Sequence, residues 1–161
     1  MNRFEIVSVN LSPGRGTAKK PVSRAEAGLS GIAGDGHSGD WHRQVSLLDI
    51  ESIQTFSDAS GLDIAPGDFG ENLTIGGGRF QELVPGVRLS GDGGPVLLVT
   101  QVGKECHGDE CAIFARVGKC VMPVRGVFCR VESPGVLRKG GFLTVKDPEP
   151  GTGRGEEVEV R

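Results

Sequence analysis

The chain has 161 residues, a length typical of one domain with a single hydrophobic core. Its 27 glycines and 9 prolines follow no period and stand among apolar runs, so neither a collagen-like nor a disordered chain is indicated. Eighteen Lys and Arg against 21 Asp and Glu give a net charge of −3 without a basic cluster, which argues against nonspecific nucleic-acid binding. A folded domain with a small-molecule partner is expected.

Short runs of β-forming residues recur along the chain, separated by turns rich in Gly and Pro. We expect strands at residues 4–9, 43–48, 72–75, 87–89, 96–102, 124–131 and 142–145. The run at 96–102 begins with apolar residues on both faces, so it is expected in the middle of a sheet. Many short strands with such turns predict an all-β barrel or sandwich.

One helix is expected after the second strand. Ser46 and Asp49 resemble a capping pair at its start, and Gly61 is the expected stop. Its apolar positions recur every three residues at Leu47, Ile50, Ile53 and Phe56. This stripe predicts a helix packed on the sheet.

The folded domain is expected to cover residues 1–146, and residues 147–161 are expected to form a flexible tail because they mix Pro, Gly, Glu and Arg. The first residues lack a hydrophobic targeting region, and no apolar run approaches the length of a membrane span. We therefore expect a cytoplasmic protein without membrane association.

The four cysteines are crowded into 24 residues of the chain, at Cys106, Cys111, Cys120 and Cys129. In a reducing compartment they are better interpreted as thiols, metal ligands or catalytic groups than as disulfides. Strand alternation places Cys129 on the same face as the valines two residues before and after it, which predicts a core residue.

Cys106 follows the end of the expected central strand, a position where rigid scaffolds commonly present functional groups. Lys104 and His107 lie nearby in sequence, and positive charge stabilises a thiolate. Cys111 and Cys120 are either buried residues or second thiols for exchange with Cys106, and Cys111 is preferred of the two. A zinc site that uses three of these cysteines with His107 is the alternative.

The segment 34–44, GDGHSGDWHRQ, carries several glycines that let a ligand approach the backbone. His37, His42 and Arg43 supply hydrogen-bond donors suited to phosphate. Two alternatives stay open: a metal site formed by its aspartates and histidines, or a polar turn that leads into the next strand.

The segment 66–74, PGDFGENLT, presents Glu71 and Asn72, a carboxylate and an amide that can match the edge of a heterocycle such as a pterin. Taken alone, it is a turn followed by a strand. Lys19 and Lys20 add either a phosphate contact or a solvated basic loop.

In these motifs and their order, over about residues 4–146, the chain resembles the MOSC domain family, named for the C-terminal part of molybdenum cofactor sulfurase, in its small freestanding bacterial form. The matching segments are 34–48, 66–74, 103–107, 120–123 and 126–128. The resemblance implies an all-β, MOSC-type closed β-barrel with one or two short helices, similar to the β-barrel domain of pyruvate kinase.

The resemblance also implies a site for the molybdenum cofactor, which contains molybdopterin. Cys106 matches the family's cysteine, which handles sulfur or ligates molybdenum, and Cys111 is expected to be the second catalytic thiol. The positions that match motifs around the cofactor pocket are His37, Arg43, Glu71, Asn72 and Lys104.

The leading hypothesis is an accessory protein that binds molybdenum cofactor and uses Cys106 to carry sulfur as a persulfide or to ligate molybdenum. The chain has no room for a pyridoxal phosphate domain, so a separate sulfur donor such as a cysteine desulfurase is expected. One alternative is a molybdenum-dependent reductase of N-hydroxylated bases or amines with a redox partner. Another is a noncatalytic module with a structural zinc or thiol site, so whether the chain is an enzyme stays open.

Overall fold

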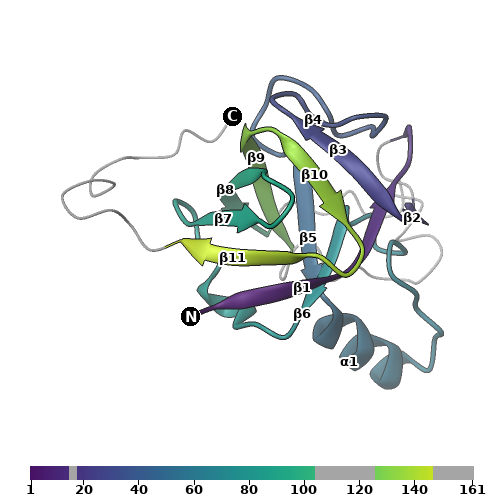
Figure 1. Cartoon of the computed structure of the whole chain (residues 1–161). Coiled ribbons are helices and arrows are strands. Elements are labelled where there is room, and N and C mark those ends of the chain that lie inside the picture. The colour runs from purple at the N-terminus through teal and green to yellow at the C-terminus, as the bar shows by residue number, and fades with distance from the viewer. Residues whose placement is uncertain (15–17, 104–125, 147–161) are drawn as a thin grey trace.

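The structure, a computed structural model, describes residues 1–14, 18–103 and 126–146 (Figure 1). Seven strands close into a barrel because β1 pairs with β11 on one side and with β6 on the other. In order around the ring the strands are β1 (Arg3–Leu11), β11 (Phe142–Lys146), β7 (Arg88–Gly91), β8 (Val96–Val102), β9 (Val127–Ser133), β5 (Val45–Asp49) and β6 (Leu73–Gly76). Only β5 and β6 run parallel among these neighbours. The expected all-β closed barrel is confirmed.

Four shorter strands lie outside the ring. β2 (Lys20–Val22) pairs with the C-terminal half of β1, and β3 (Arg24–Gly28), β4 (Gly31–Ile32) and β10 (Gly135–Arg138) form a second sheet (Figure 1). None of the four was expected from the sequence. They have two to five residues each and little β-branched character, so pairing with neighbours determines their conformation more than propensity does.

Each of the seven expected strands corresponds to a strand of the barrel, and β8 has the expected bounds. β5 begins later than expected, so Arg43 lies in the loop before it. The first two residues of the expected strand at 124–131 lie outside the described residues, as does the expected tail at 147–161.

The expected helix is α1 (Ile50–Ser60), and its end at Gly61 is confirmed. Gly61 has a φ of 73°, a conformation that favours glycine, and its N–H bonds to the Ser57 carbonyl. The expected start was wrong: Ser46 and Leu47 belong to β5, and Asp49 is the N-cap residue without a side-chain capping bond. Strand pairing with β6 and β9 extends β5 through the positions that had looked like a cap.

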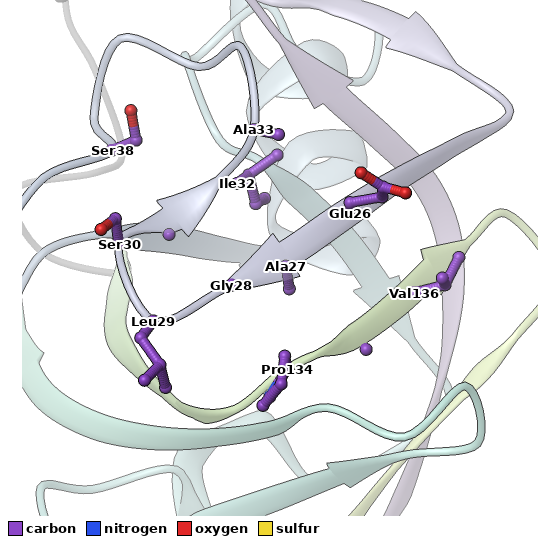
Figure 2. A pocket seen from close by; sticks show the side chains of 12 residues that line it. Glu26, Ala27, Gly28, Leu29, Ser30, Ile32, Ala33, Ser38, Pro134 and Val136 are labelled. Atoms are coloured by element: carbon purple, nitrogen blue, oxygen red, sulfur yellow. The ribbon is translucent and has the colours of Figure 1, made fainter.

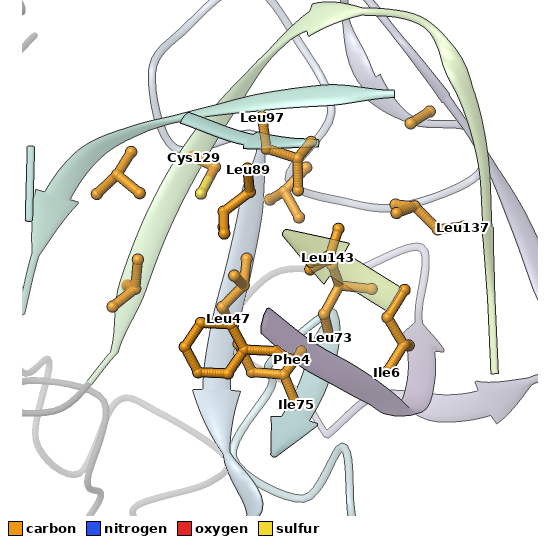
Figure 3. Packing of buried hydrophobic residues seen from close by; sticks show 14 of the residues in the cluster. Phe4, Ile6, Leu47, Leu73, Ile75, Leu89, Leu97, Cys129, Leu137 and Leu143 are labelled. Carbon is orange, nitrogen blue, oxygen red and sulfur yellow. The ribbon is translucent and has the colours of Figure 1, made fainter. Parts of the chain in front are cut away.

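The barrel interior is filled by inward-facing apolar side chains such as Phe4, Leu47, Leu97 and Cys129, all without solvent exposure (Figure 3). Strand alternation places them inside, and a register shift after Ile6 in β1 adjusts the pattern. Each fully buried Leu or Phe side chain contributes roughly 1.5–3 kcal/mol.

A second apolar cluster lies on the outside of β5 and β9, where Leu48 and Phe128 pack against Ile53 of α1 and Phe69. Phe56 completes this layer, with its ring edge-to-face on Phe69 at 5.1 Å between centroids. α1 therefore covers one side of the barrel. Within the described ranges, no helix combines the length and apolar character that crossing a membrane requires.

Candidate functional site

The cysteine-bearing segment leaves the barrel between β8 and β9. Gly103 donates a hydrogen bond from its N–H to the Gly126 carbonyl at 2.7 Å, so the two ends of this segment lie side by side. Cys106, Cys111, Cys120 and Lys104 all fall between them, outside the described residues. Their expected roles stay predictions.

Cys129 lies in β9 with no solvent exposure and packs in the barrel interior with Val127 and Val131. Burial raises the pKa of its thiol far above the usual value. The expectation that Cys129 is a core residue is confirmed.

His37, Trp41 and Arg43 form a contiguous set of contacts on the loop before β5. The rings of His37 and Trp41 are stacked, with 6.3 Å between centroids, and the indole N–H donates to the His37 carbonyl at 2.6 Å. The Arg43 Cζ lies 4.9 Å from the centroid of the Trp41 ring and 5.7 Å from that of Phe128, within cation–π range. This loop therefore brings two of the expected cofactor-binding residues together.

A buried ion pair supports the loop from beneath. Lys19 Nζ lies 2.7 Å from Asp35 Oδ1, and neither side chain is exposed. The same oxygen accepts the Ser12 N–H at 3.1 Å, and Oδ2 accepts the His37 N–H at 3.0 Å. Burial alone would raise the pKa of Asp35, but the hydrogen bonds from His37 and Lys19 lower it well below its usual value. Asp35 is therefore charged at neutral pH.

Glu71 is joined to Lys19 through Gly67. The Lys19 N–H donates to the Gly67 carbonyl, and the Gly67 N–H donates to Glu71 Oε2, both at 2.8 Å. Gly67 has a φ of 91°, and a Cβ there would collide with the Lys19 carbonyl oxygen, so this close approach requires glycine.

The Glu71 carboxyl is fully buried. Oε2 also accepts the Thr74 hydroxyl at 2.7 Å, whereas Oε1 has no hydrogen-bond partner among the described residues. Burial raises the pKa of Glu71 to about 7, although the bonds from Gly67 and Thr74 act in the opposite direction.

Asn72 is also fully buried, and its amide is bonded on both sides. Its Oδ1 accepts the Ser46 N–H at 3.0 Å and the Ser46 hydroxyl at 3.2 Å, and its Nδ2 donates to the Asn10 carbonyl at 3.2 Å. Asn72 thereby ties β5 and β1 to the start of β6.

We use the name polar corner for Lys19, Asp35, His37 and Glu71, which these contacts connect at one corner of the barrel, together with Asn72, the residue that follows Glu71. Arg43 adjoins the polar corner through Trp41. Four of the five expected cofactor-binding residues thus lie in or beside one region. The fifth, Lys104, lies outside the described residues.

Other polar residues of the same loop have structural partners. His42 is buried, and Thr100 Oγ1 contacts its carbonyl at 2.7 Å and its Nδ1 at 3.2 Å. Asp40 pairs with Arg130 at 2.8 Å. In the part of the chain that the structure describes, no group of three His, Cys, Asp or Glu side chains is placed to hold a metal.

Sequence reasoning missed the Lys19–Asp35 pair and the role of Trp41. The two partners are separated by 16 positions, and no local pattern marks Lys19 as buried. Lys19 is buried, and of the two lysines in that segment only Lys20 is exposed, as a solvated basic loop would require. The sequence signal that could have pointed to Asp35 was its position between two glycines, close to His37.

A surface pocket of about 610 Å³ lies beside the second sheet, between the turn that joins β3 to β4 and residues 134–136 (Figure 2). Twelve of the described residues line it, and Glu26 is the one with a charged side chain among them. Ser38 belongs both to this lining and to the loop of the polar corner, and its hydroxyl donates to the Asp35 carbonyl at 2.7 Å. Among the expected site residues that the structure describes, none lines this pocket.

Comparisons with known proteins identify the fold and the family. The MOSC domain model matches residues 34–144. The YuaD protein of Bacillus subtilis superposes with a TM-score of 0.72 at 20% identity, covering 88% of this chain and 94% of that one. YiiM of Geobacillus stearothermophilus gives a TM-score of 0.71 at 21% identity, with 92% and 77% covered. YiiM of Escherichia coli gives 0.59 at 21% identity, with 98% and 73% covered.

No curated protein sequence matched the chain. The family match nevertheless extends over more than half of the chain, and it includes the polar corner from Asp35 onward together with the cysteine segment. The solved structures share the barrel at low sequence identity and so support the fold alone. The chain belongs to the MOSC domain family.

Proposed function

We propose that this MOSC chain binds the molybdenum cofactor or its molybdopterin precursor, and that the Cys106 thiol carries sulfur or ligates molybdenum. The observation that carries the proposal is the position of Arg43, whose guanidinium lies over Phe128, two residues after Gly126. The cysteine segment rejoins the barrel at Gly126, beside its own starting point at Gly103. Cys106 follows Gly103 by three residues, which span at most about 11 Å, and we therefore propose that its thiol works near Arg43.

The donors at this place suit the phosphate end of such a cofactor. Arg43 offers a planar guanidinium that can donate two parallel hydrogen bonds to a phosphate. Lys104, next to Gly103 in the chain, would add a second cation. Arg43 and Lys104 are proposed to hold the phosphate, and His37, on the same loop as Arg43, is proposed to bind another part of the cofactor and to help orient it toward Cys106.

Glu71 and Asn72 are proposed to contribute indirectly. Both side chains are fully buried and bonded within the protein. They fix the loop at residues 66–72 against Lys19 and β5, so the loop that carries His37 and Arg43 has a rigid base. Such support holds binding groups in their productive geometry.

Soft thiolate sulfur suits both roles proposed for Cys106. In sulfur transfer, the Cys106 thiolate attacks the outer sulfur of a donor persulfide, a new S–S bond forms, and the donor leaves as a thiolate. Attack by the Cys111 thiolate on the inner sulfur then gives a Cys106–Cys111 disulfide and releases hydrosulfide. A bound molybdenum would supply oxygen- or sulfur-atom transfer chemistry. The donor is proposed to be a protein of the cysteine desulfurase type.

Cofactor content tests the proposal. Protein purified from cells that make molybdenum cofactor should contain molybdenum and a pterin that becomes fluorescent on oxidation. Arg43→Gln removes charge-assisted hydrogen bonds, so pterin content should fall roughly tenfold or more. Arg130→Gln is the matched control, because Arg130 of β9 pairs with the exposed loop residue Asp40 and has no proposed role.

Cys106→Ser separates the thiol from the rest of the site. It should lose bound molybdenum or the persulfide while the protein remains folded. A wild-type protein that contains neither pterin nor molybdenum, together with a Cys106→Ser variant that changes nothing in cofactor maturation, would contradict the proposal.

A further inference from the structure

The backbone N–H, the backbone carbonyl and the ring of His37 each make a contact that holds the residue in place. Its N–H donates to Asp35 Oδ2 at 3.0 Å, and its carbonyl accepts the Trp41 indole N–H at 2.6 Å. Its ring stacks on Trp41 with an interplanar angle of 17°. These contacts restrict rotation of the imidazole, so the two ring nitrogens face different surroundings.

Nδ1 is the ring nitrogen that faces the carboxylate. It lies 3.6 Å from Asp35 Oδ2, longer than a hydrogen bond and within ion-pair range. The His37 side chain is 16% exposed, whereas that of Asp35 is completely buried. The ring thus reaches from a buried acceptor toward the surface.

The charge of Asp35 is already balanced. Lys19 Nζ contacts Oδ1 at 2.7 Å, and the Ser12 N–H binds the same oxygen. Because the ion pair is neutral as a unit, it has little net attraction for a positive charge on His37. The Asp35 carboxylate still affects where the imidazole proton lies. Its Oδ2 atom is close to Nδ1 and therefore favours the tautomer with the proton on Nδ1.

We propose that Asp35, fixed by Lys19, is the positioning residue of His37 and keeps its imidazole neutral with the proton on Nδ1. Nε2 then carries the lone pair and acts as a hydrogen-bond acceptor. The ligand group that meets His37 is therefore an N–H or O–H donor, as on the edge of a pterin ring, rather than a fully ionised phosphate oxygen. Only the identity of the ligand rests on the proposed function.

The tautomer can be measured without any ligand. The full chain contains three histidines, so a long-range ¹H–¹⁵N spectrum of the imidazoles is simple, and His37→Gln assigns the signals of His37. At neutral pH, Nδ1 should show the shift of a protonated nitrogen and Nε2 that of an unprotonated one. A wild-type His37 that is charged, or that carries its proton on Nε2, would overturn the inference whether or not any variant folds.

Two variants of the same loop test the cause. Asp35→Asn should move the His37 signals toward the Nε2–H tautomer, which unconstrained imidazoles prefer. Asp40→Asn removes an exposed carboxylate five positions away and should leave them unchanged. Equal spectra for wild type and Asp35→Asn would show that Asp35 does not position the ring.

Binding of 6-hydroxymethylpterin, followed by fluorescence, connects the tautomer to the ligand. His37→Gln and Asp35→Asn should each weaken binding roughly tenfold, as loss of an orienting partner commonly does, and the double variant should be no weaker than either. Additive losses would overturn the positioning role. Absence of pterin binding by a wild-type protein with the expected tautomer would instead contradict the pterin assignment and the proposed function, while the positioning role would stand.

Discussion

The barrel interior and the buried part of the polar corner, which comprises Lys19, Asp35, Glu71 and Asn72, are both closed to water, yet they are stabilised by different interactions. Phe4 and Leu97 in the interior contact apolar neighbours, so either can be replaced by an apolar side chain of similar volume at little cost in stability. Lys19 and Glu71 in the polar corner depend on particular partners, because a buried charge or polar group without its partner is strongly destabilising. Loss of side-chain volume therefore destabilises the interior, whereas loss of a hydrogen-bond or ion-pair partner destabilises the polar corner.

Removal of one partner of the buried ion pair should have the largest effect. Lys19→Met leaves the Asp35 carboxylate buried without its cation, and we expect a loss of about 3–5 kcal/mol in the free energy of unfolding, measured with urea. Lys20→Met, at an exposed position of β2, should change it by less than about 0.5 kcal/mol. Equal stability of the two variants would show that the pair does not support the polar corner.

The same comparison can be sharpened with a second substitution. Asp35→Asn combined with Lys19→Met removes both charges, so the double variant should recover part of the stability that Lys19→Met loses. No leucine in the barrel interior has a partner whose removal would have this compensating effect.

A volume change in the interior should come next. Leu97→Ala removes a fully buried side chain of β8 and should lower the free energy of unfolding by about 2–5 kcal/mol. Leu98→Ala, at the next and partly exposed position of the same strand, is the matched control and should cost less. A larger loss for Leu98→Ala in urea unfolding would contradict the inward and outward assignment of β8.

Glu71 gives the polar corner a pH dependence that the interior lacks. Its pKa is about 7 in the folded protein and lies near the ordinary value of 4.5 in the unfolded chain. The folded state therefore keeps a proton that the unfolded chain releases, and stability falls as pH rises from about 4.5 to 7. Glu71→Gln resembles the protonated carboxyl, so its stability relative to wild type should rise by roughly 3 kcal/mol across this interval.

Urea unfolding at pH 5 and pH 8 measures this difference. Glu5→Gln, which changes an exposed carboxylate of β1, should show no comparable gain. A wild-type protein and a Glu71→Gln variant with parallel pH profiles would mean that Glu71 is ionised in the folded state throughout this range.

The smallest effect is expected at the surface. Arg88 and Glu132 form a two-point ion pair across the barrel strands, with distances of 2.6 and 3.1 Å, and both side chains are partly exposed. Solvent screens such pairs, so Glu132→Gln should cost less than about 1 kcal/mol in urea unfolding. A cost similar to that of Lys19→Met would remove the distinction between buried and exposed charges.

The barrel could be predicted from the sequence because its strands carry a local signal. Alternation in β1 and the apolar run of β8 indicate which side chains face inward, and Cys129 was placed correctly in this way. The short strands of the second sheet lack such a signal, since their conformation depends on pairing between distant segments.

The polar corner could be predicted only in part. The motifs around His37 and Glu71 identified the right region, but they did not show which residues lie on the loop near the surface and which are buried and support it. Lys19 and Asp35 meet across 16 positions, and Asn72 bonds to Ser46 across 26. Such long-range hydrogen bonds have no period in the sequence, so only the fold shows that Glu71 and Asn72 are buried beneath the loop that carries His37.

The central proposal is that Cys106 is the working thiol beside this supported loop. Intact-mass and metal analysis of gently purified full chain tests it most directly, with Cys106→Ser compared against Cys129→Ala, whose thiol is buried in the barrel. Wild type and Cys129→Ala should carry bound molybdenum or a sulfur adduct of about 32 Da, and Cys106→Ser should carry neither. A wild-type protein with stoichiometric zinc that is lost together with folding in Cys106→Ser would contradict the proposal and indicate a structural metal site.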